Sequence, residues 1–115
     1  MAPQPGEVWF ADLDPTPPAR GHEHAGPRPV LVVSNAAYNA SPRGLVVVVP
    51  FTTRLRPLNL MIRVDPPEGG LRQPSQAICD QIRAVALGRL VARWGIVQPQ
   101  TLAAVKLRIA GLLDI

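Results

Sequence analysis

The sequence predicts a mainly β protein of the α+β class, in which short antiparallel strands form a small curled sheet or barrel and one helix closes the chain. Two valine-rich segments, residues 28–34 and Leu45–Thr52, are apolar runs of the length typical of buried strands. Other short strand-like segments surround them without long helical patterns in between, which argues against a parallel α/β layer. A sustained helical spacing of apolar residues is expected only after Pro99.

The first strand is expected over residues 6–13, where Val8, Trp9 and Phe10 follow a polar–apolar rhythm. Prolines and glycines then fill residues 14–27, which excludes a helix or a ladder strand there. Loops longer than about 12 residues are uncommon in compact domains and are often functional. This long loop is therefore a candidate part of a functional site.

A polar segment, residues 35–44, joins the two valine-rich strands. A basic loop with Pro57 follows the second of them at residues 54–59, and residues 60–64 alternate well enough for another strand. A cluster of turn residues then ends that strand, namely Pro66, Pro67, Gly69 and Gly70.

The last part of the chain predicts a strand, a turn and a helix. Residues 75–86 have strand-like character, and residues 87–94 predict a short helical turn. Pro99 stands where a helix begins. The helix then presents one apolar face, made of Leu102, Val105, Ile109, Leu112 and Leu113.

Length and charge limit the organisation and the partners. The 115 residues fit one domain, residues 1–115, and 47% of them are hydrophobic, which is enough for one core. The net charge is +4 and the sequence pI is about 10.6. All but Lys106 of the 12 basic residues are arginines, whose planar donors match phosphate groups. Nucleic acid is thus a reasonable partner, although an acidic protein would be attracted by the same field.

The cellular compartment is expected to be the cytoplasm. The longest aliphatic runs are far shorter than the roughly 20 residues that span a bilayer, so we expect no contact with a membrane. The single cysteine, Cys79, has no partner for an internal disulfide and is interpreted as a small buried hydrophobe.

Several kinds of catalytic site have no motif in this sequence. No glycine-rich phosphate loop, CxxC pair or GxSxG motif is present. His22, Glu23 and His24 look like the start of a zinc motif, but Gly26 stands where the second histidine of HExxH would be. We therefore expect no metal and no cofactor, and an exposed loop position for at least one of these histidines.

Arg28 and Thr52 are the more informative pair. If their strands are neighbours, both residues reach the same edge of the sheet. An arginine can bind phosphate oxygens bidentately, and a threonine hydroxyl can donate to the same group. Each residue also has an ordinary explanation, because Arg28 can be a surface charge and Thr52 a β-branched strand residue. Spacing alone leaves both interpretations open.

A resemblance that covers nearly the whole chain bears on this choice. The motifs occur in the order Gly6-Glu7-Val8-Trp9, Asp12-Leu13-Asp14-Pro15-Thr16, Gly21-His22-Glu23, Gly26-Pro27-Arg28-Pro29-Val30, Pro50-Phe51-Thr52-Thr53 and Cys79-Asp80-Gln81-Ile82-Arg83. In this order they resemble the MazF/PemK family of toxins. The resemblance implies an SH3-like barrel with a C-terminal helix, a homodimer, and an endoribonuclease that cuts single-stranded RNA without a metal. It also implies an antitoxin whose acidic tail blocks the RNA groove.

The resemblance further implies roles for individual residues. Arg28 and Thr52 match the catalytic arginine and threonine, and His22, Glu23 and Asp80 are further candidates for proton transfer. The implied reaction is attack of the RNA's own 2′-hydroxyl on the adjacent phosphorus, with release of a 5′-hydroxyl. Arginine is a poor base, so we expect it to stabilise charge. RNA contacts are expected from the loops, at Thr53, Arg54, Arg56, Asn59 and Gln81.

One position departs from the family pattern. Some PemK-like members place an arginine two residues before the acid that matches Asp80, whereas this chain has Ile78. A proton relay through that arginine is therefore not expected here. Both tryptophans, Trp9 and Trp94, are predicted to be structural.

Two other functions remain open at this point. A gyrase poison of the CcdB kind has a similar fold and depends on Trp-Gly-Ile at its extreme C-terminus. This chain contains Trp94-Gly95-Ile96, but the predicted helix follows it, which argues against that function. The composition would equally permit a non-catalytic SH3-like module that binds RNA or protein.

Overall fold

The structure is a computed structural model that describes residues 2–13, 26–57 and 59–115. Within these ranges seven strands form one sheet in which every pairing is antiparallel. The strands are β1 (Glu7–Asp12), β2 (Pro27–Val32), β3 (Leu45–Thr52), β4 (Met61–Val64), β5 (Ser75–Ile78), β6 (Arg83–Ala86) and β7 (Leu90–Ile96). The helices are α1 (Ala36–Asn39) and α2 (Pro99–Leu113), with 3-10 turns η1 (Glu68–Gly70), η2 (Cys79–Gln81) and η3 (Leu87–Arg89). The predicted class, mainly antiparallel β with a C-terminal helix, is confirmed.

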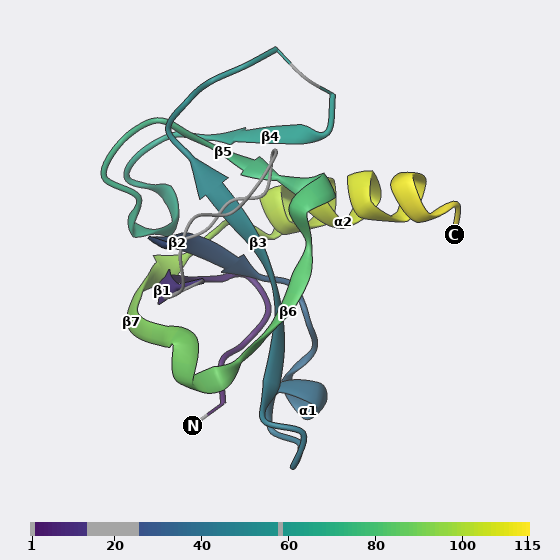
Figure 1. The fold of residues 1–115 in the computed structure, drawn as a ribbon. Coiled ribbons are helices and arrows are strands. Elements are labelled where there is room, and N and C mark those ends of the chain that lie inside the picture. Colours follow the sequence, from purple (N-terminus) through teal and green to yellow (C-terminus); the bar gives the residue numbers. More distant parts are fainter. Residues whose placement is uncertain (1, 14–25, 58) are drawn as a thin grey trace.

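The long strand β3 connects the two parts of the sheet (Figure 1). One edge of β3 pairs with β2, which continues through β1 to β7. The other edge pairs with β6 along its first half and with β5 at its end, beyond which lies β4. Because β3 has different partners along its length, the sheet curls around it.

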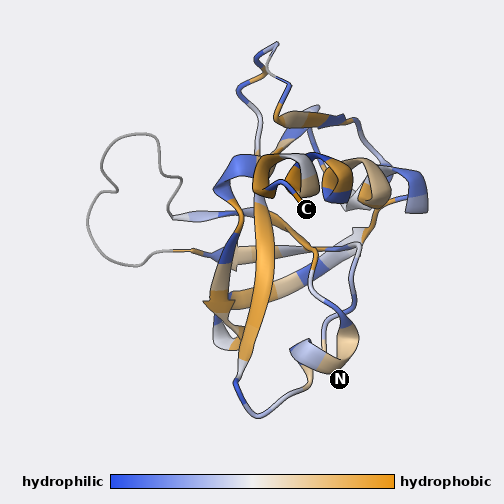
Figure 2. Ribbon diagram, turned by 90° about the vertical axis from the view of Figure 1, so that its right-hand side faces the viewer, coloured by the Kyte–Doolittle hydropathy of each residue, from blue (hydrophilic) through white to orange (hydrophobic). Residues whose placement is uncertain are grey.

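The apolar side chains of β2 and β3 are buried on both faces of the sheet. Val30 and Val32 belong to one core cluster, whereas Leu31 between them belongs to another, which also includes Val105 and Ile109 of α2. A strand covered on both sides needs a continuous apolar run, as the sequence shows. Figure 2 shows β3 as hydrophobic along most of its length.

Helix α2 begins at Pro99 as predicted, and a distant carboxylate caps it. Glu68 in η1 accepts hydrogen bonds at Oε2 from the backbone N–H of Gln98, at 3.0 Å, and from Oγ1 of Thr101, at 2.5 Å. This carboxylate accepts one backbone N–H that the helix start leaves without a partner inside the helix, and its charge suits the helix N-terminus. The apolar face is narrower than predicted, because Leu112 and Leu113 remain 45% and 55% exposed.

The prediction for residues 75–86 as one strand is wrong in detail. The chain forms β5, then η2, then β6, because β5 pairs with the end of β3 and β6 with its beginning. The turn η2 carries the chain from one pairing position to the other.

The predicted helical turn over residues 87–94 is also wrong for most of its length. Only η3 is helical, and β7 pairs with β1 instead. Much of β7 is exposed and its register contains a shift at Trp94, so its sequence lacks the alternation that marks a half-buried strand. Pairing with β1 therefore decides the conformation rather than local sequence.

Three smaller features complete the fold. Asn35 starts α1 inside the predicted polar segment by accepting the backbone N–H of Tyr38 at Oδ1, at 2.8 Å.

Cys79 is buried as expected, and burial raises the pKa of its thiol to about 11. In the described part of the chain, no helix has the length and apolar character needed to cross a membrane.

Candidate functional site

A pocket of about 300 Å³ lies where the start of β2 meets the end of β3. Its lining residues are Phe10, Pro27, Arg28, Pro29, Phe51, Thr52, Thr53 and Ser75. The strand register explains why Arg28 and Thr52 are together. Val30 pairs with Pro50. Because the strands are antiparallel, two residues toward the start of β2 and two residues toward the end of β3 lead from this pair to Arg28 and Thr52. The expected meeting of these two residues at one edge is therefore observed.

Arg28 is held against the end of β3. Its Nη1 donates to the backbone carbonyl of Phe51 at 3.3 Å. Burial lowers the pKa of the Arg28 guanidinium from its usual value, but arginine remains a cation in proteins. A positive charge in such a partly buried position acts more strongly on a bound anion than the same charge in water.

Thr52 is oriented by the chain that follows it. Its Oγ1 accepts the backbone N–H of Arg54 at 3.1 Å. A hydroxyl that accepts one hydrogen bond can still donate its own proton. Thr52 can therefore donate to a group in the pocket while its position is fixed.

The buried Gln76 side chain, 8% exposed, holds the loop after Thr52 in place. Its Nε2 donates to the carbonyl of Arg56 at 2.6 Å, and its Oε1 accepts the N–H of Arg56 at 2.8 Å. Thr52 and Gln76 are also the last paired residues of β3 and β5. The amide therefore extends the ladder beyond the point where the strands diverge, and it fixes the backbone of the exposed Arg56.

Replacing Gln76 with alanine should free this loop locally. Two hydrogen bonds of about 1 kcal/mol each are lost, so amide hydrogen exchange at Arg56 should accelerate by roughly tenfold or more, whereas exchange at Val48 in β3 should change less. Exchange measured by NMR checks this, with Gln73→Ala, an exposed glutamine, as the control. Equal acceleration at Arg56 and Val48 would show that the whole fold, not the loop, depends on Gln76.

The pocket wall formed by Phe10 is a feature that the sequence did not indicate. Phe10 stacks on Trp94 of β7, with ring centroids 5.4 Å apart and an interplanar angle of 17°. The guanidinium of Arg72 lies 4.2 Å from the centroid of the Trp94 ring. This wall depends on the pairing of β1 with β7, which local sequence patterns do not predict.

The other predicted site residues are distributed differently. Thr53 lines the pocket, and Arg54 and Arg56 are exposed on the following loop. Asp80 and Gln81 lie on η2 and are not among the lining residues. Asn59 borders a separate hollow against α2, together with Arg108. His22 and Glu23 lie outside the described residues.

Three further observations concern the other expectations. Ile78, which stands where some relatives have an arginine, is 2% exposed and lies in the core. Trp94-Gly95-Ile96 lies within β7 and is followed by α2, not by the chain end. Across residues 2–13, 26–57 and 59–115, no group of three His, Cys, Asp or Glu side chains is placed to hold a metal ion.

Comparisons of sequence point to one family. A family model described as PemK-like, MazF-like toxin of type II toxin-antitoxin system matches residues 4–113. The chain is 37% identical over 103 residues to the endoribonuclease MazF9 of Mycobacterium tuberculosis, and the match covers 85% of each protein. It is 31% identical over 114 residues to the endoribonuclease toxin MazF of Escherichia coli K12, covering 96% of this chain and 94% of the relative.

Solved structures agree with these matches. The crystal structure of MazF from Deinococcus radiodurans superposes with a TM-score of 0.82 at 28% identity, over 100% of this chain and 99% of the other. An endoribonuclease from a mycobacterial species, solved in complex with its cognate antitoxin, gives a TM-score of 0.78 at 26% identity. That match covers 99% of this chain and 97% of the other.

Proposed function

Because the chain belongs to the PemK-like, MazF-like family of type II toxins and is an endoribonuclease, we propose that it cleaves single-stranded RNA without a metal ion, with Arg28 and Thr52 at the reacting phosphate. The observation that carries this proposal is the pocket in which a partly buried guanidinium and a fixed hydroxyl face the same space. Such a pair suits a phosphate on which charge increases during the reaction.

The reaction needs no nucleophile from the protein. The 2′-oxygen of the RNA forms a bond to the adjacent phosphorus, and the bond from that phosphorus to the 5′-oxygen breaks. The 2′-hydroxyl loses its proton and the departing 5′-oxygen gains one. The products are a 2′,3′-cyclic phosphate and a 5′-hydroxyl. Arg28 stabilises the additional charge on the phosphoryl oxygens, and the Thr52 hydroxyl donates to one of them.

Proton transfer is assigned to residues other than Arg28. Arginine stays protonated, so Arg28 is unsuited to act as a base. Asp80, exposed on η2, is a candidate for this task, as are His22 and Glu23 from the segment outside the described residues. A carboxylate or an imidazole can exchange protons near neutral pH when its surroundings shift its pKa suitably.

Binding of the RNA on either side of the cut is assigned to the neighbouring loops. Thr53 shares the pocket, and Arg54 and Arg56 extend from the loop that Gln76 holds. Gln81 on η2 and Asn59 beside α2 are the other proposed contacts. Side chains on fixed loops can read the edges of unstacked bases, which gives sequence selectivity.

The proposed partners follow from the family and the charge. One of the similar structures holds its cognate antitoxin, so we expect this chain to bind an antitoxin too, through an acidic tail that covers the basic site. We also expect a homodimer with the RNA groove across it. A CcdB-like action on gyrase has less support, because Trp94-Gly95-Ile96 is internal.

The test is cleavage of a long, sequence-diverse RNA by the purified protein in excess EDTA. We expect discrete fragments whose 5′ ends can be phosphorylated directly by a polynucleotide kinase, because those ends carry a hydroxyl. Pancreatic-type ribonuclease contamination is controlled with a preparation of Arg28→Ala made in parallel. Intact RNA in EDTA, with cleavage restored by a divalent ion, would contradict metal independence, and 5′-phosphate ends would contradict the 2′-hydroxyl mechanism.

A further inference from the structure

We propose that Phe10, Trp94 and Arg72 form a binding surface for the nucleotide next to the cleaved step, with the base against the aromatic pair and the following phosphate at Arg72. Trp94 contacts both other side chains, Phe10 by ring stacking and Arg72 through its guanidinium, and we call the three side chains the aromatic column. The inference rests on the proposed function, because Phe10 belongs to the wall of the Arg28–Thr52 pocket. It gives Trp94 a role beyond the structural one that the sequence predicts.

A β-bulge places Trp94 in the column. Trp9 pairs with Arg93 and Val8 pairs with Gly95, so Trp94 is the extra residue between two pairs of the β1–β7 ladder. Bulges of this kind re-aim a side chain and often occur beside active sites. Here the result is a nearly parallel packing of Trp94 on Phe10.

The backbone at Trp94 packs closely against the turn η1, which limits its freedom to move. Gly70 has a φ of 71°, and a Cβ added there would lie 2.2 Å from the carbonyl oxygen of Trp94. A Cβ added at Gly95 would lie 2.7 Å from the carbonyl carbon of Gly69. Only glycines allow η1 and β7 to approach so closely. A rigid aromatic surface loses little conformational entropy when a base binds to it.

Arg72 supplies positive charge at the outer end of the column. In the described part of the chain the two ion pairs are Arg63 with Asp65 and Arg93 with Glu7, and neither involves Arg72. Arg72 is exposed and stacks on Trp94. Arginine and aromatic side chains together are a common surface for single-stranded nucleic acid, since the rings stack bases and the guanidinium meets phosphate.

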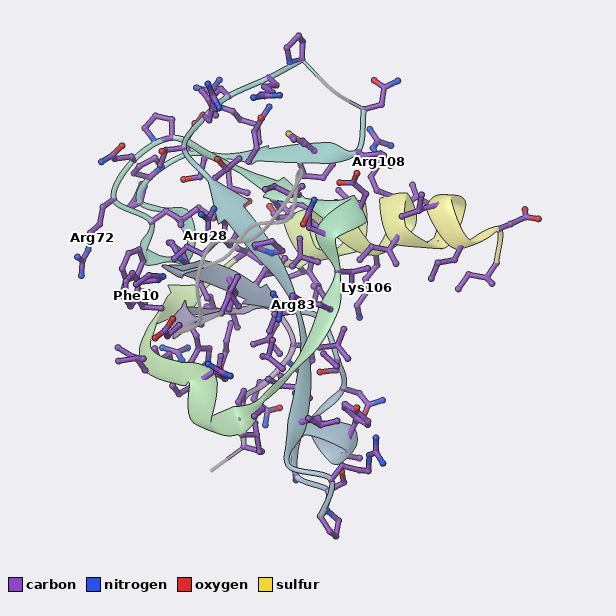
Figure 3. The ribbon with its side chains drawn as sticks, in the orientation of Figure 1. Phe10, Arg28, Arg72, Arg83, Lys106 and Arg108 are labelled. Atoms are coloured by element: carbon purple, nitrogen blue, oxygen red, sulfur yellow. The ribbon has the colours of Figure 1, made fainter. Side chains whose placement is uncertain are left out.

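The aromatic column also determines on which side of Arg28 the neighbouring nucleotide is expected to lie. In Figure 3 Phe10 and Arg72 lie on one side of Arg28, whereas Lys106 and Arg108 of α2 lie on the other. The α2 side offers cations but, at the hollow beside Asn59, its lining contains aliphatic rather than aromatic side chains. The base next to the cut is therefore assigned to the β1–β7 side. Arg108 becomes a matched control for Arg72, because both are exposed arginines.

Binding is measured with a short 2′-O-methyl oligouridine, whose blocked 2′-oxygens cannot attack phosphorus. A second oligomer has the same phosphates but abasic sugars. In a Trp9→Phe protein Trp94 is the only tryptophan. We expect the oligouridine to change the fluorescence of Trp94 in a saturable way, and the abasic oligomer to change it much less.

The second part of the test compares the affinities of substituted proteins for the two oligomers. Trp94→Leu should weaken binding of the oligouridine by roughly fivefold or more, and weaken the abasic oligomer less, since stacking of one base contributes about that much. Arg72→Ala should weaken binding of both oligomers, because both carry the phosphate assigned to Arg72. Arg108→Ala should have a smaller effect that is equal for the two oligomers. If Trp94→Leu fails to fold, the fluorescence of the Trp9→Phe protein still decides.

Two results would overturn the assignment while leaving the proposed function intact. One is RNA cleavage and oligouridine binding without any change in Trp94 fluorescence. The other is a loss of affinity in Arg108→Ala that equals or exceeds the loss in Arg72→Ala. A protein that neither binds the oligouridine nor cleaves RNA would overturn the proposed function together with the inference.

Discussion

Replacing Arg28 with alanine is expected to lower the rate of RNA cleavage by about 10³-fold, because the variant loses the cation at the pocket that Arg28 shares with Thr52. The described lining residues contain no other charged side chain that could take its place. Arg28→Lys should recover only part of the rate, since a lysine keeps the charge but has no planar pair of donors. Single-turnover cleavage of a defined RNA gives these rates directly.

The matched control for this change is Arg43→Ala. Arg43 is an exposed arginine in the loop before β3, at the opposite end of that strand from Thr52. Arg43→Ala removes one positive charge, as Arg28→Ala does, so a general loss of attraction to RNA would appear in both variants. Equal rates for Arg28→Ala and the unsubstituted protein, at equal folded concentration, would show that Arg28 is not at the reacting phosphate.

Thr52 should show a sharp difference between two small substitutions. Thr52→Val keeps the shape of the side chain but removes the hydroxyl, and we expect cleavage to fall by about 10²-fold. Thr52→Ser keeps the hydroxyl, so its rate should stay within about tenfold of the unsubstituted protein. The reduction in Thr52→Val should appear in kcat rather than KM if the hydrogen bond strengthens in the transition state.

The loop after Thr52 provides an internal check on this prediction. Thr52 Oγ1 also accepts the N–H of Arg54, so a valine could displace the loop as well as remove the donor. Gln76 still fixes that loop through Arg56 in the variant. Unchanged amide exchange at Arg56 would show that the loop stays in place. Similar rates for Thr52→Val and Thr52→Ser would mean that the hydroxyl has no part in the reaction.

The sequence predicted those parts of the fold whose local patterns agree with their final environment. The valine-rich β3 is buried on both faces, so its apolar run identifies it with the bounds Leu45–Thr52. Helix α2 has proline at its first turn and buries Val105 and Ile109 at helical spacing. In both elements, composition, periodicity and burial favour the same structure.

The features that the sequence did not predict depend on contacts between residues far apart in the chain. β7 is largely exposed, and its bulge at Trp94 interrupts any alternation, so only its pairing with β1 reveals it as a strand. The same pairing creates the wall of Phe10 and Trp94 beside the pocket. The Gln76 side chain likewise acts through a backbone 20 residues away in the sequence. Local patterns carry no information about such contacts.

The candidate site was predictable only in part for the same reason. Arg28 and Thr52 were candidates because each adjoins a strand that the sequence predicts, and the β2–β3 register then brings them together. Asn59 is close to Thr52 in sequence, yet it borders the hollow beside α2, because it leads into β4, which lies beyond β5 at the edge of the sheet. Proximity along the chain is therefore a weaker guide than strand register.

A single 2′-deoxynucleotide tests the central claim, that the RNA's own 2′-hydroxyl attacks a phosphate held by Arg28 and Thr52. The cleaved steps of a defined RNA are first mapped by sequencing the new ends. The nucleotide on the 5′ side of one step is then replaced by its 2′-deoxy form. We predict that cleavage at that step disappears while the other steps are cut as before. Cleavage at the deoxy step at its original rate would contradict the mechanism, because the attacking oxygen would then have to come from elsewhere.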